Sequence, residues 1–452
     1  MKVTAILLAA GLGTRMKSNL PKVLHPVAGK PMLWYALRAV QLASTEKPVV
    51  IVGHGAQQVS ELVGQSAHCV LQEPQLGTGH AVMLAEALLK GKTDYVIVSY
   101  ADMPLLRGET FQRLVEMQKQ NSGPLTLLTV NADDPRGFGR ILRKPDGTVA
   151  AIVEEFVATP QQKAIKELNV GAYCFSADWL WEALRRIPLS PKGEYYLTDT
   201  VELAAQDGLP VQALLHDDLS ETIGINTRVH LAEAEAHMRE RINRDLMLSG
   251  VTMTDPASTY IEAGVKIGRD TIIYPNTYIQ GETAIGEDCS IGPNTHIRDA
   301  RIGNRCQVFM SVVEGARLDD DVDVGPFARL RKGAHLMSHV HMGNFGEVKD
   351  STLGPGVKMG HFSYIGNAHI GANTNIGAGT ITCNFDGERK HPTEIGENVF
   401  IGSDTMLVAP LKIGKGARTG AGAVVTRDVP EETVVVGVPA RAIRKLTKHD
   451  ST

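Results

Sequence analysis

The first half of the chain alternates short apolar runs with segments of mixed polarity, up to about residue 228. Several of the apolar runs have no polar break, which is typical of strands that are buried on both faces. The predicted strands are 3–10, 48–53, 69–72, 95–99 and 125–130, and the predicted helices are 32–42, 79–89 and 109–120. This alternation predicts a parallel sheet with crossover helices, in which functional loops lie at the carboxyl ends of the strands.

A different pattern begins after residue 228. Apolar residues then recur at helical spacing as Leu231, Ala234, Met238, Ile242 and Leu246, and Gly250 follows as a stop signal. We therefore expect a linking helix over 229–250 between two domains, 1–228 and 251–452.

From Ile261 onward the aliphatic residues repeat at steps of six, a period that belongs neither to a helix nor to a flat strand. The first run is Ile261, Ile267, Ile273, Ile279, Ile285, Ile291 and Ile297. The register then slips and returns as Ile395, Ile401, Leu407, Ile413, Thr419 and Val425. A β-solenoid has this period, with aliphatic residues pointing inward and glycines at tight corners. The alternative is a β-sandwich with regular turns. Hexapeptide coils are left-handed in known families, against the usual crossover preference.

Composition and charge limit the classes of protein to which the chain can belong. The 452 residues favour two domains, and the net charge of −4 gives no global basic field for nucleic acid. The five cysteines show no CxxC spacing, so a reduced, cytoplasmic protein is expected. The N-terminal apolar run ends in glycines and is predicted as a buried strand rather than a signal peptide. No window of 18 or more apolar residues predicts a membrane span.

The stretch LLAAGLGTRM places Gly11 and Gly13 directly after the first predicted strand. Such a loop can bind a dinucleotide, cradle a nucleoside triphosphate or simply form a turn. The third glycine of the dinucleotide motif GxGxxG is missing here, and so is the GK[ST] of a P-loop. Arg15 and Lys22 follow closely. Because glycines let backbone N–H groups approach phosphate oxygens, and these cations would neutralise a triphosphate, we favour a phosphate cradle with Arg15 and Lys22 as catalytic residues.

At these residues the chain resembles the sugar-nucleotide pyrophosphorylases. LAAGLGTRM and PKVLHPVAGKPM carry the resemblance, with LQEPQLGTGHA, GFGRI, GEYYLTD and GINTR further along. GPFARLRKGAHL, GHFSYIG, NIGAGTITCNFDG and FIGSDTMLVAP extend it to about Val436, and they are similar to the bifunctional family of N-acetylglucosamine-1-phosphate uridyltransferases and glucosamine-1-phosphate acetyltransferases. The resemblance implies an α/β Rossmann-like nucleotidyltransferase domain, a linking helix and a left-handed parallel β-helix of hexapeptide repeats.

The resemblance implies a uridylyl-transfer site in the first half, where the phosphate of N-acetylglucosamine 1-phosphate attacks the α-phosphorus of UTP and pyrophosphate leaves. Asp102, at a strand end, is a candidate Mg²⁺ ligand, because magnesium takes oxygen ligands, and by similarity Asn226 is the second. The implied nucleotide- and sugar-binding residues are Leu8, Ala9, Ala10, Gly11, Lys22, Gln72, Gly77, Thr78, Tyr100, Ala101, Asp102, Gly139, Glu154, Asn169 and Asn226.

Three residues depart from the usual family pattern in this half. Ala101 stands where the family usually has glycine, so we expect altered affinity for sugar or nucleotide. Phe156 and Val157 stand where the family usually has lysine and aspartate. If that lysine contacts the sugar phosphate, its contact is missing and the uridylyl step is expected to be slower.

The resemblance implies an acetyl-transfer site in the second half, with His361 as the catalytic base that deprotonates the amine of glucosamine 1-phosphate. The implied sugar-phosphate-binding residues are Arg331, Lys349, Tyr364, Asn375 and Lys390. The implied acetyl-CoA-binding residues are Ala378, Asn384, Phe385, Ser403 and Ala421. The family's coenzyme-contacting arginine aligns with Val438, and Arg441 lies three residues further on as a substitute.

By similarity the β-helices pack as a homotrimer with acetyltransferase sites between subunits, and the product feeds bacterial cell-wall and lipopolysaccharide precursors. Partners are then UTP, both sugar phosphates and acetyl-CoA, with Mg²⁺ as cofactor. One alternative is a pyrophosphorylase whose β-helix only regulates or assembles, as in ADP-glucose-type enzymes. Another is a non-enzymatic scaffold with a degenerate Rossmann-like domain.

Overall fold

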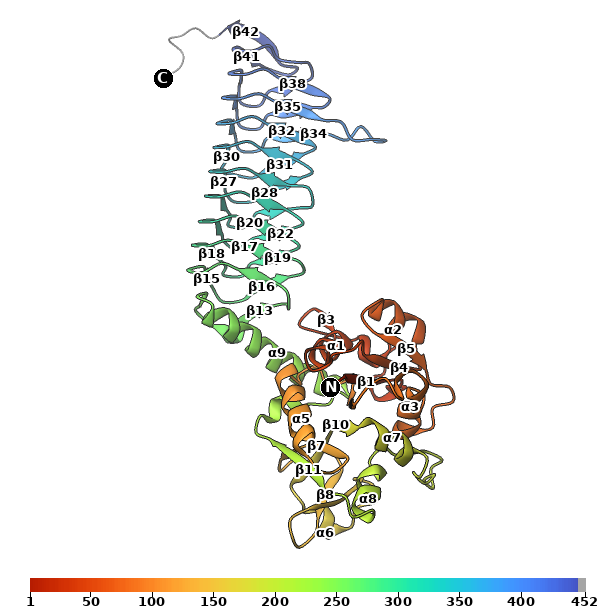
Figure 1. Cartoon of the computed structure of the whole chain (residues 1–452). Coiled ribbons are helices and arrows are strands. Elements are labelled where there is room, and N and C mark those ends of the chain that lie inside the picture. Colours follow the sequence, from red (N-terminus) through yellow and green to blue (C-terminus); the bar gives the residue numbers. More distant parts are fainter. Residues whose placement is uncertain (446–452) are drawn as a thin grey trace. The chain divides into compact units, whose positions relative to one another are not determined.

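The computed structural model describes residues 1–445 and divides into two compact units. The first unit is Met1–Met238, and the second begins at Arg239 (Figure 1). The division falls inside helix α9 (Arg228–Leu248), which begins one residue earlier and ends two residues earlier than the predicted linking helix. Among residues 1–445, no helix combines the length and the apolar character that crossing a bilayer requires.

The first unit is built on a central sheet with the strand order β11-β7-β10-β6-β1-β4-β5, to which the hairpin of β8 and β9 is attached. Its strands are β1 (Val3–Ala9), β4 (Val49–Val52), β5 (His68–Leu71), β6 (Tyr95–Tyr100), β7 (Leu125–Asn131), β8 (Arg140–Arg143), β9 (Val149–Val153), β10 (Glu167–Ser176) and β11 (Val211–His216), with a separate hairpin of β2 (Pro26–Val27) and β3 (Lys30–Pro31). Its helices before α9 are α1 (Met32–Ala43), α2 (Ala56–Val63), α3 (Gly77–Met83), α4 (Glu86–Leu89), α5 (Gly108–Gln120), α6 (Pro160–Lys163), α7 (Ala177–Leu184) and α8 (Asp199–Gln206).

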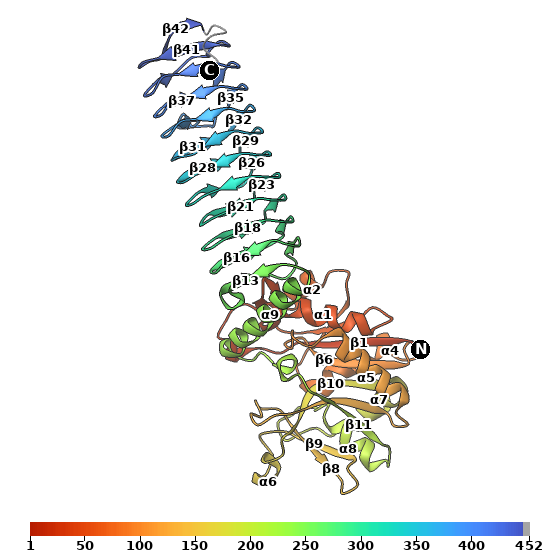
Figure 2. The same cartoon turned by 90° about the vertical axis from the view of Figure 1, so that its left-hand side faces the viewer.

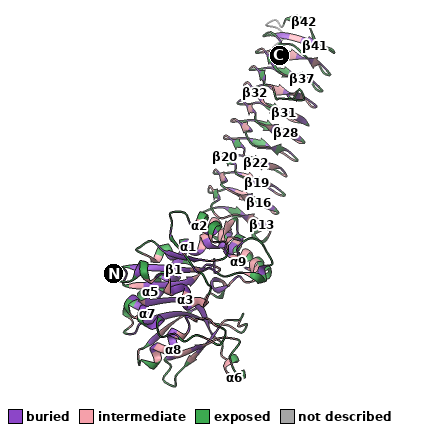
Figure 3. Cartoon of the chain, turned by 90° about the vertical axis from the view of Figure 1, so that its right-hand side faces the viewer, coloured by how far each residue is buried: buried purple, intermediate pink, exposed green. Residues whose placement is uncertain are grey.

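The five strands expected from the apolar runs are all present, and Figure 3 shows that the sheet they form is largely buried. The expectation of a parallel sheet is confirmed for β1, β4, β5 and β6 and is wrong for β10, which runs antiparallel to both β6 and β7. A register shift between Asn169 and Tyr173 interrupts the pairing of β10 with β7. The helix expected over 79–89 is two helices, α3 and α4. The parallel pairing of β4 and β6 with β1 still places the carboxyl ends of these three strands at one edge, where ligands bind in such folds.

The second unit is a column of short strands that stack into three sheets along the described residues (Figure 2). The twelve-stranded sheet holds β12 (Thr252–Met253), β15 (Ile272–Ile273), β18 (Ser290–Ile291), β21 (Gln307–Val308), β24 (Asp323–Val324), β27 (His341–Met342), β30 (Lys358–Met359), β33 (Asn375–Ile376), β36 (Phe400–Ile401), β39 (Arg418–Thr419), β41 (Thr433–Val436) and β42 (Arg441–Lys445). The ten-stranded sheet holds β13 (Thr259–Ile261), β16 (Thr277–Gln280), β19 (His296–Arg298), β22 (Val312–Glu314), β25 (Arg329–Leu330), β28 (Gly346–Lys349), β31 (Ser363–Gly366), β34 (Ile381–Cys383), β37 (Met406–Val408) and β40 (Val424–Val425). The nine-stranded sheet holds β14 (Lys266–Ile267), β17 (Ala284–Ile285), β20 (Arg301–Ile302), β23 (Arg317–Leu318), β26 (His335–Leu336), β29 (Thr352–Leu353), β32 (Ala368–Ile370), β35 (Thr393–Ile395) and β38 (Leu411–Ile413).

Successive coils of this β-helix stack in register. Ile279 of one coil pairs with Ile297 of the next, three steps of six residues along the chain, and both side chains are fully buried. The slip in the sequence pattern has a structural cause, because Ile285 pairs with Ile302 and that coil is one residue shorter. Residues 384–392 form a longer insertion between β34 and β35. The shorter coil still directs its aliphatic side chain inward, since Ile302 is 5% exposed.

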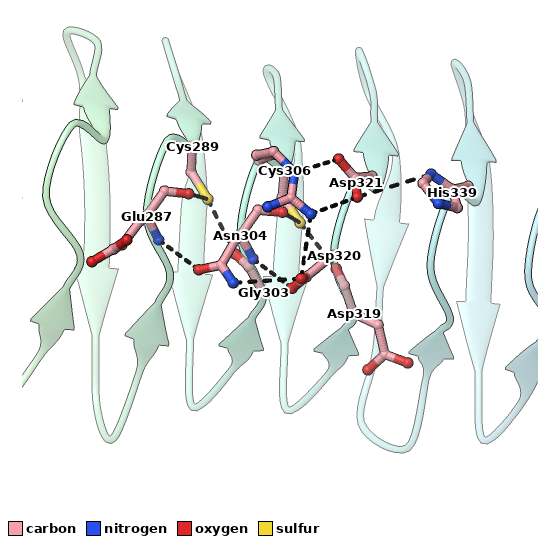
Figure 4. Close-up of polar contacts among 10 residues, drawn as sticks. Glu287, Cys289, Gly303, Asn304, Cys306, Asp319, Asp320, Asp321 and His339 are labelled. Carbon is pink, nitrogen blue, oxygen red and sulfur yellow. Dashed lines mark hydrogen bonds and ion pairs between the residues drawn. The ribbon is translucent and has the colours of Figure 1, made fainter.

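Polar groups at the corners tie each coil to the next (Figure 4). The Glu287 N–H donates to Asn304 Oδ1 at 2.9 Å, and the Asn304 N–H donates to Asp320 Oδ1 at 2.8 Å. The buried thiol of Cys289 donates to the carbonyl of Gly303 at 3.1 Å. Backbone groups that a tight corner leaves unpaired are therefore satisfied by the neighbouring coil, which keeps the wall rigid.

Candidate functional sites

A cleft of about 640 Å³ lies at the carboxyl ends of β1, β5 and β6. The predicted residues that line it are Leu8, Ala9, Ala10, Gly11, Lys22, Gln72, Gly77, Thr78, Tyr100, Asp102, Gly139, Glu154, Asn169 and Asn226. Arg15 is exposed on the 3-10 helix η1 (Thr14–Met16) and Ala101 is fully buried, so neither lines the cleft. A larger recess of about 1110 Å³ lies at the amino ends of β1 and β6. We place the site in the smaller cleft, because ligands of α/β sheets bind beyond the carboxyl ends of the strands.

The glycine loop after β1 positions one cation. Gly13 has a φ of 62°, and a Cβ at this position would lie 2.7 Å from the Cβ of Lys22. Lys22 belongs to the 3-10 helix η2 (Lys22–Leu24), and its ammonium forms a close ion pair with Asp102. The same ammonium donates to Asn226 Oδ1 at 3.1 Å. The absence of a side chain at Gly13 therefore lets Lys22 reach across the loop to these two oxygens.

Asp102 and Asn226 provide an oxygen pair that suits a hard divalent cation. The Ile225 N–H donates to the Asp102 carbonyl at 3.0 Å, which ties the GINTR segment to the end of β6, and both side-chain oxygens converge on Lys22. Residues 1–445 contain no group of three or more His, Cys, Asp or Glu side chains arranged for a metal. A cation here would complete its shell with water and phosphate oxygens, which is how Mg²⁺ is usually held.

The second wall of the cleft is a fixed polar surface formed by Gln72, Gly77 and Thr78. Gln72 is 5% exposed, and its side-chain amide donates to the Gly77 carbonyl at 2.9 Å. Gly77 has a φ of 94°, and a Cβ there would lie 2.6 Å from the carbonyl oxygen of Tyr195. The Thr78 hydroxyl accepts the Leu197 N–H at 3.0 Å. A planar base can lie against such a surface, because no side chain projects from Gly77 and the amide of Gln72 is held in place.

The third wall carries a carboxylate and an amide. Burial raises the pKa of Glu154, although a hydrogen bond from the Thr198 hydroxyl at 3.0 Å opposes the shift. Asn169 is 8% exposed; its side-chain NH₂ donates to Tyr173 Oη at 2.7 Å and its Oδ1 accepts the Gly171 N–H. Glu154 and Asn169 thus present acceptors and donors of fixed orientation, which suits the hydroxyl and amide groups of a sugar.

The prediction missed a segment that borders the same wall. Glu194, Tyr196 and Thr198 line the cleft, and the sequence signal was the GEYYLTD stretch, from which no individual residue was selected. The departing residues Phe156 and Val157 are 54% and 61% exposed, close in sequence to Glu154 but outside the lining of the cleft.

In the second unit, His361 lies on the corner between β30 and β31 and is exposed. Its Nδ1 is 3.4 Å from the Oδ1 of Asn344, which occupies the same corner of the preceding coil and was not predicted. Three predicted coenzyme residues continue this corner along later coils: Ala378, Ser403 and Ala421. Hydrogen bonds join the corners, since Gly379 N–H donates to Phe362 O at 2.6 Å and Gly422 N–H donates to Ser403 O at 2.8 Å. The fold therefore aligns His361 with residues up to sixty positions away.

Cations gather at the opposite edge of the ten-stranded sheet, because Arg331 follows β25 and Lys349 is the last residue of β28. Arg331 donates to Glu347 at 2.8 Å, and Lys349 lies 3.6 Å from Asp350. Glu347 pairs directly with Tyr364 in the next coil, so Tyr364 continues the same face. The neighbouring Lys349 ammonium lowers the pKa of Lys390. Two ammonium groups that repel each other and lie near a guanidinium form a positively charged surface that suits an anion.

The remaining predicted residues of the second unit are placed as follows. Asn375 lies in β33 of the twelve-stranded sheet. Asn384 is 6% exposed and its side chain donates to Asn367 at 2.7 Å, whereas Phe385 on the following insertion is 59% exposed. Val438 is 73% exposed, and Arg441, in β42, donates to the Ala440 carbonyl at 3.0 Å.

Comparisons with known proteins match the two parts of the chain to different family models. Residues 5–194 match the family model of the MobA-like NTP transferase domain, and residues 264–299 and 392–427 match that of bacterial transferase hexapeptide repeats. Among curated relatives, the bifunctional protein GlmU of Heliobacterium modesticaldum is 49% identical over 96% of this chain and 95% of its own. Those of Geobacillus sp. and Streptococcus equi subsp. zooepidemicus are 47% and 44% identical, each over 98% of this chain and 97% of their own. A solved structure of a putative glucose-1-phosphate thymidylyltransferase from Bacillus anthracis is 20% identical and covers 53% of this chain and 96% of that chain, with a TM-score of 0.45.

Fold and sites together define a nucleotidyltransferase unit followed by a hexapeptide-repeat transferase unit with a left-handed β-helix. The chain belongs to the GlmU family of bifunctional proteins. It is an enzyme with acetyltransferase and uridyltransferase activities in the synthesis of UDP-N-acetylglucosamine. This finding decides against a pyrophosphorylase with a purely structural β-helix and against a scaffold without activity.

Proposed function

We propose that the two activities are divided between the units, with uridylyl transfer in the cleft of the first unit and acetyl transfer at the His361 corner of the second. The observation that carries the proposal is the convergence of Lys22, Asp102 and Asn226 in the cleft, while His361 and the cation cluster lie in the other unit. The functional domains are then 1–228 and 251–452, joined by the helix over 229–250.

In uridylyl transfer two anions must meet, so positioning and charge neutralisation carry most of the rate. Gln72, Gly77 and Thr78 would hold uracil, while Glu154 and Asn169 would hold the sugar. Lys22 would neutralise negative charge on the triphosphate. Arg15, on the exposed η1, would contact the outer phosphates.

Mg²⁺ is the cofactor in this proposal, held by Asp102 and Asn226. When bound, it would neutralise phosphate charge and favour pyrophosphate as a leaving group. Lys22 contacts both oxygens in the structure, so this ammonium must give up at least part of that contact as the cation and the triphosphate enter.

In acetyl transfer, His361 takes the proton from the amine of glucosamine 1-phosphate as the nitrogen attacks the thioester carbon of acetyl-CoA. The bond from nitrogen to the acetyl carbon forms, and coenzyme A leaves as a thiol after protonation. Arg331, Lys349 and Lys390 would bind the sugar phosphate with Tyr364 and Asn375. The corner residues Ala378, Ser403 and Ala421 would contact the coenzyme, together with Asn384 and Phe385.

The proposal includes a homotrimer in which a neighbouring β-helix completes the acetyltransferase site. The support is a row of exposed phenylalanines at the same corner as His361: Phe309, Phe327, Phe345 and Phe362, which are 45%, 52%, 60% and 55% exposed. Phe327 and Phe345 stack with their ring centroids 5.4 Å apart. Such a row would be buried by a second copy of the chain. The cytoplasm is the proposed location, where five free cysteines stay reduced.

One variant and one change of assay conditions test the division of the activities. Asp102→Ala is expected to abolish pyrophosphate release from UTP and N-acetylglucosamine 1-phosphate, while coenzyme A release from acetyl-CoA and glucosamine 1-phosphate continues. Omission of Mg²⁺ is expected to have the same selectivity. Loss of both activities in a folded Asp102→Ala protein, or of neither, would overturn the assignment.

A further inference from the structure

The sugar end of the cleft has fewer positive than negative side chains. Among the described residues that line the cleft, Lys22 is the one cation, against the carboxylates Asp102, Glu154 and Glu194. Lys22 is already paired with Asp102. Glu154 and Glu194 therefore face an incoming sugar phosphate, which is itself an anion, and the repulsion must be offset by a cation nearby.

A cation lies beside this end, on a loop that borders the cleft. The ammonium of Lys192 is 3.5 Å from the centroid of the Phe156 ring. Lys192 precedes Glu194 by two residues, and Phe156 follows Glu154 by two residues, so each partner lies next to one of the two lining carboxylates. The Phe156 ring is in turn 6.3 Å from the ring of Tyr196, which lines the cleft.

Hydrogen bonds fix the loop that carries Lys192. The Gly193 N–H donates to the Ser190 carbonyl at 2.9 Å, and the Glu194 N–H donates to the Ser190 hydroxyl at 3.1 Å. Directly after the loop, the Tyr195 N–H donates to the Leu76 carbonyl at 2.8 Å. The loop is thereby anchored to the uracil-side wall, and the Phe156 ring limits where the long Lys192 side chain can move.

We propose that Lys192, seated on the face of Phe156, is the cation that attracts the sugar phosphate to its end of the cleft. This inference rests on the proposed assignment of the cleft to uridylyl transfer. The inference also changes the expectation that Phe156 slows the uridylyl step. Phe156 stands where the family usually has lysine, but its ring supports Lys192, so another segment supplies the positive charge. The role is substrate capture at long range, so it bears on the KM for the sugar phosphate and leaves the KM for UTP unchanged.

The test measures pyrophosphate release with each substrate varied in turn. Lys192→Gln is expected to raise the KM for N-acetylglucosamine 1-phosphate about five-fold at low ionic strength, and the effect should shrink in about 0.5 M salt. The double variant Lys192→Gln/Phe156→Lys is expected to restore much of the loss, because it returns a positive charge to the same place. Lys166→Gln is the matched control, since Lys166 is an exposed lysine of the same unit that pairs with Asp133 at 2.7 Å.

An unchanged KM for the sugar phosphate in Lys192→Gln would overturn the inference, as would an equal rise in the KM for UTP or an equal effect of Lys166→Gln. Failure of the double variant to restore any affinity would also count against it. Asp102→Ala in the same assay separates this inference from the assignment of the cleft. If Asp102→Ala retains uridylyl transfer, the assignment fails; if it is inactive while Lys192→Gln behaves as wild type, this inference alone fails. Acetyl transfer by each preparation reports on folding.

Discussion

The replacement Gly13→Ala tests whether the glycine loop exists to position Lys22. At a φ of 62°, alanine costs about 1–2 kcal/mol relative to its ordinary backbone conformations. Its methyl group would lie 2.7 Å from the Cβ of Lys22, where carbon atoms normally approach to about 3.5–4.0 Å. Lys22 must then move by about 1 Å. A misplacement of this size costs on the order of 100-fold in rate when positioning dominates the catalysis.

The assay is pyrophosphate release at saturating substrates, and thermal unfolding is followed in parallel. Gly147→Ala is the matched control, because Gly147 also has a positive φ, 85°, but no heavy atom lies within 4 Å of its would-be Cβ. Both variants should therefore lose similar stability, and only Gly13→Ala should lose uridylyl transfer. A Gly13→Ala protein with the wild-type rate, or a Gly147→Ala protein with the same loss of rate, would refute the reasoning.

Three further predictions concern both units. His361→Ala should abolish acetyl transfer and leave pyrophosphate release intact, as measured by assays of the two reactions on one preparation. Phe345→Ser combined with Phe362→Ser should weaken self-association, visible by analytical ultracentrifugation, and make acetyl transfer fall on dilution. Burial, with Glu202 and Glu154 nearby, raises the pKa of Asp199 to about 6; the folded state then binds more protons than the unfolded state, so stability falls as pH rises from about 4 to 6. Asp199→Asn should raise the melting temperature at pH 7.5, and this gain should vanish at pH 4.

The repeat of six residues predicted the β-helix because each buried aliphatic position recurs at the same place in every coil. The region in which the sequence pattern slips lies between the two stretches that match the hexapeptide model, which end at residue 299 and resume at 392. Shorter coils such as the one between Ile285 and Ile302 break the period there without breaking the stack. The coils are therefore stacked more regularly than the six-residue repeat of the sequence indicates, since a corner can lose a residue without disturbing the stack.

The cleft was harder to predict from local pattern. Lys22 was selected as a phosphate-neutralising residue from its proximity to the glycines, but its contact with Asp102 joins positions that only the sheet brings together. The antiparallel strand β10 was missed, and with it the reason why Asn169 faces the cleft. Lys192 directly precedes the GEYYLTD stretch but gave no signal of its own, because one lysine on an exposed turn is indistinguishable in sequence from ordinary surface.

Under the proposed division, the two scaffolds would match the shapes of the substrates that each must hold. A nucleotide with a branched arrangement of base, sugar and phosphates would be contacted by loops that converge from β1, β5 and β6 on one cleft. An elongated thioester is better matched by a periodic wall: from His361 to Ala421 the corner advances by three coils, about 14 Å at the usual strand spacing. Because every coil repeats the same corner, the small residues Ala378, Ser403 and Ala421 lie in line with His361. Insertion of a bulky side chain at Ser403 should therefore weaken acetyl-CoA binding without altering the affinity for glucosamine 1-phosphate, a split that steady-state kinetics would measure.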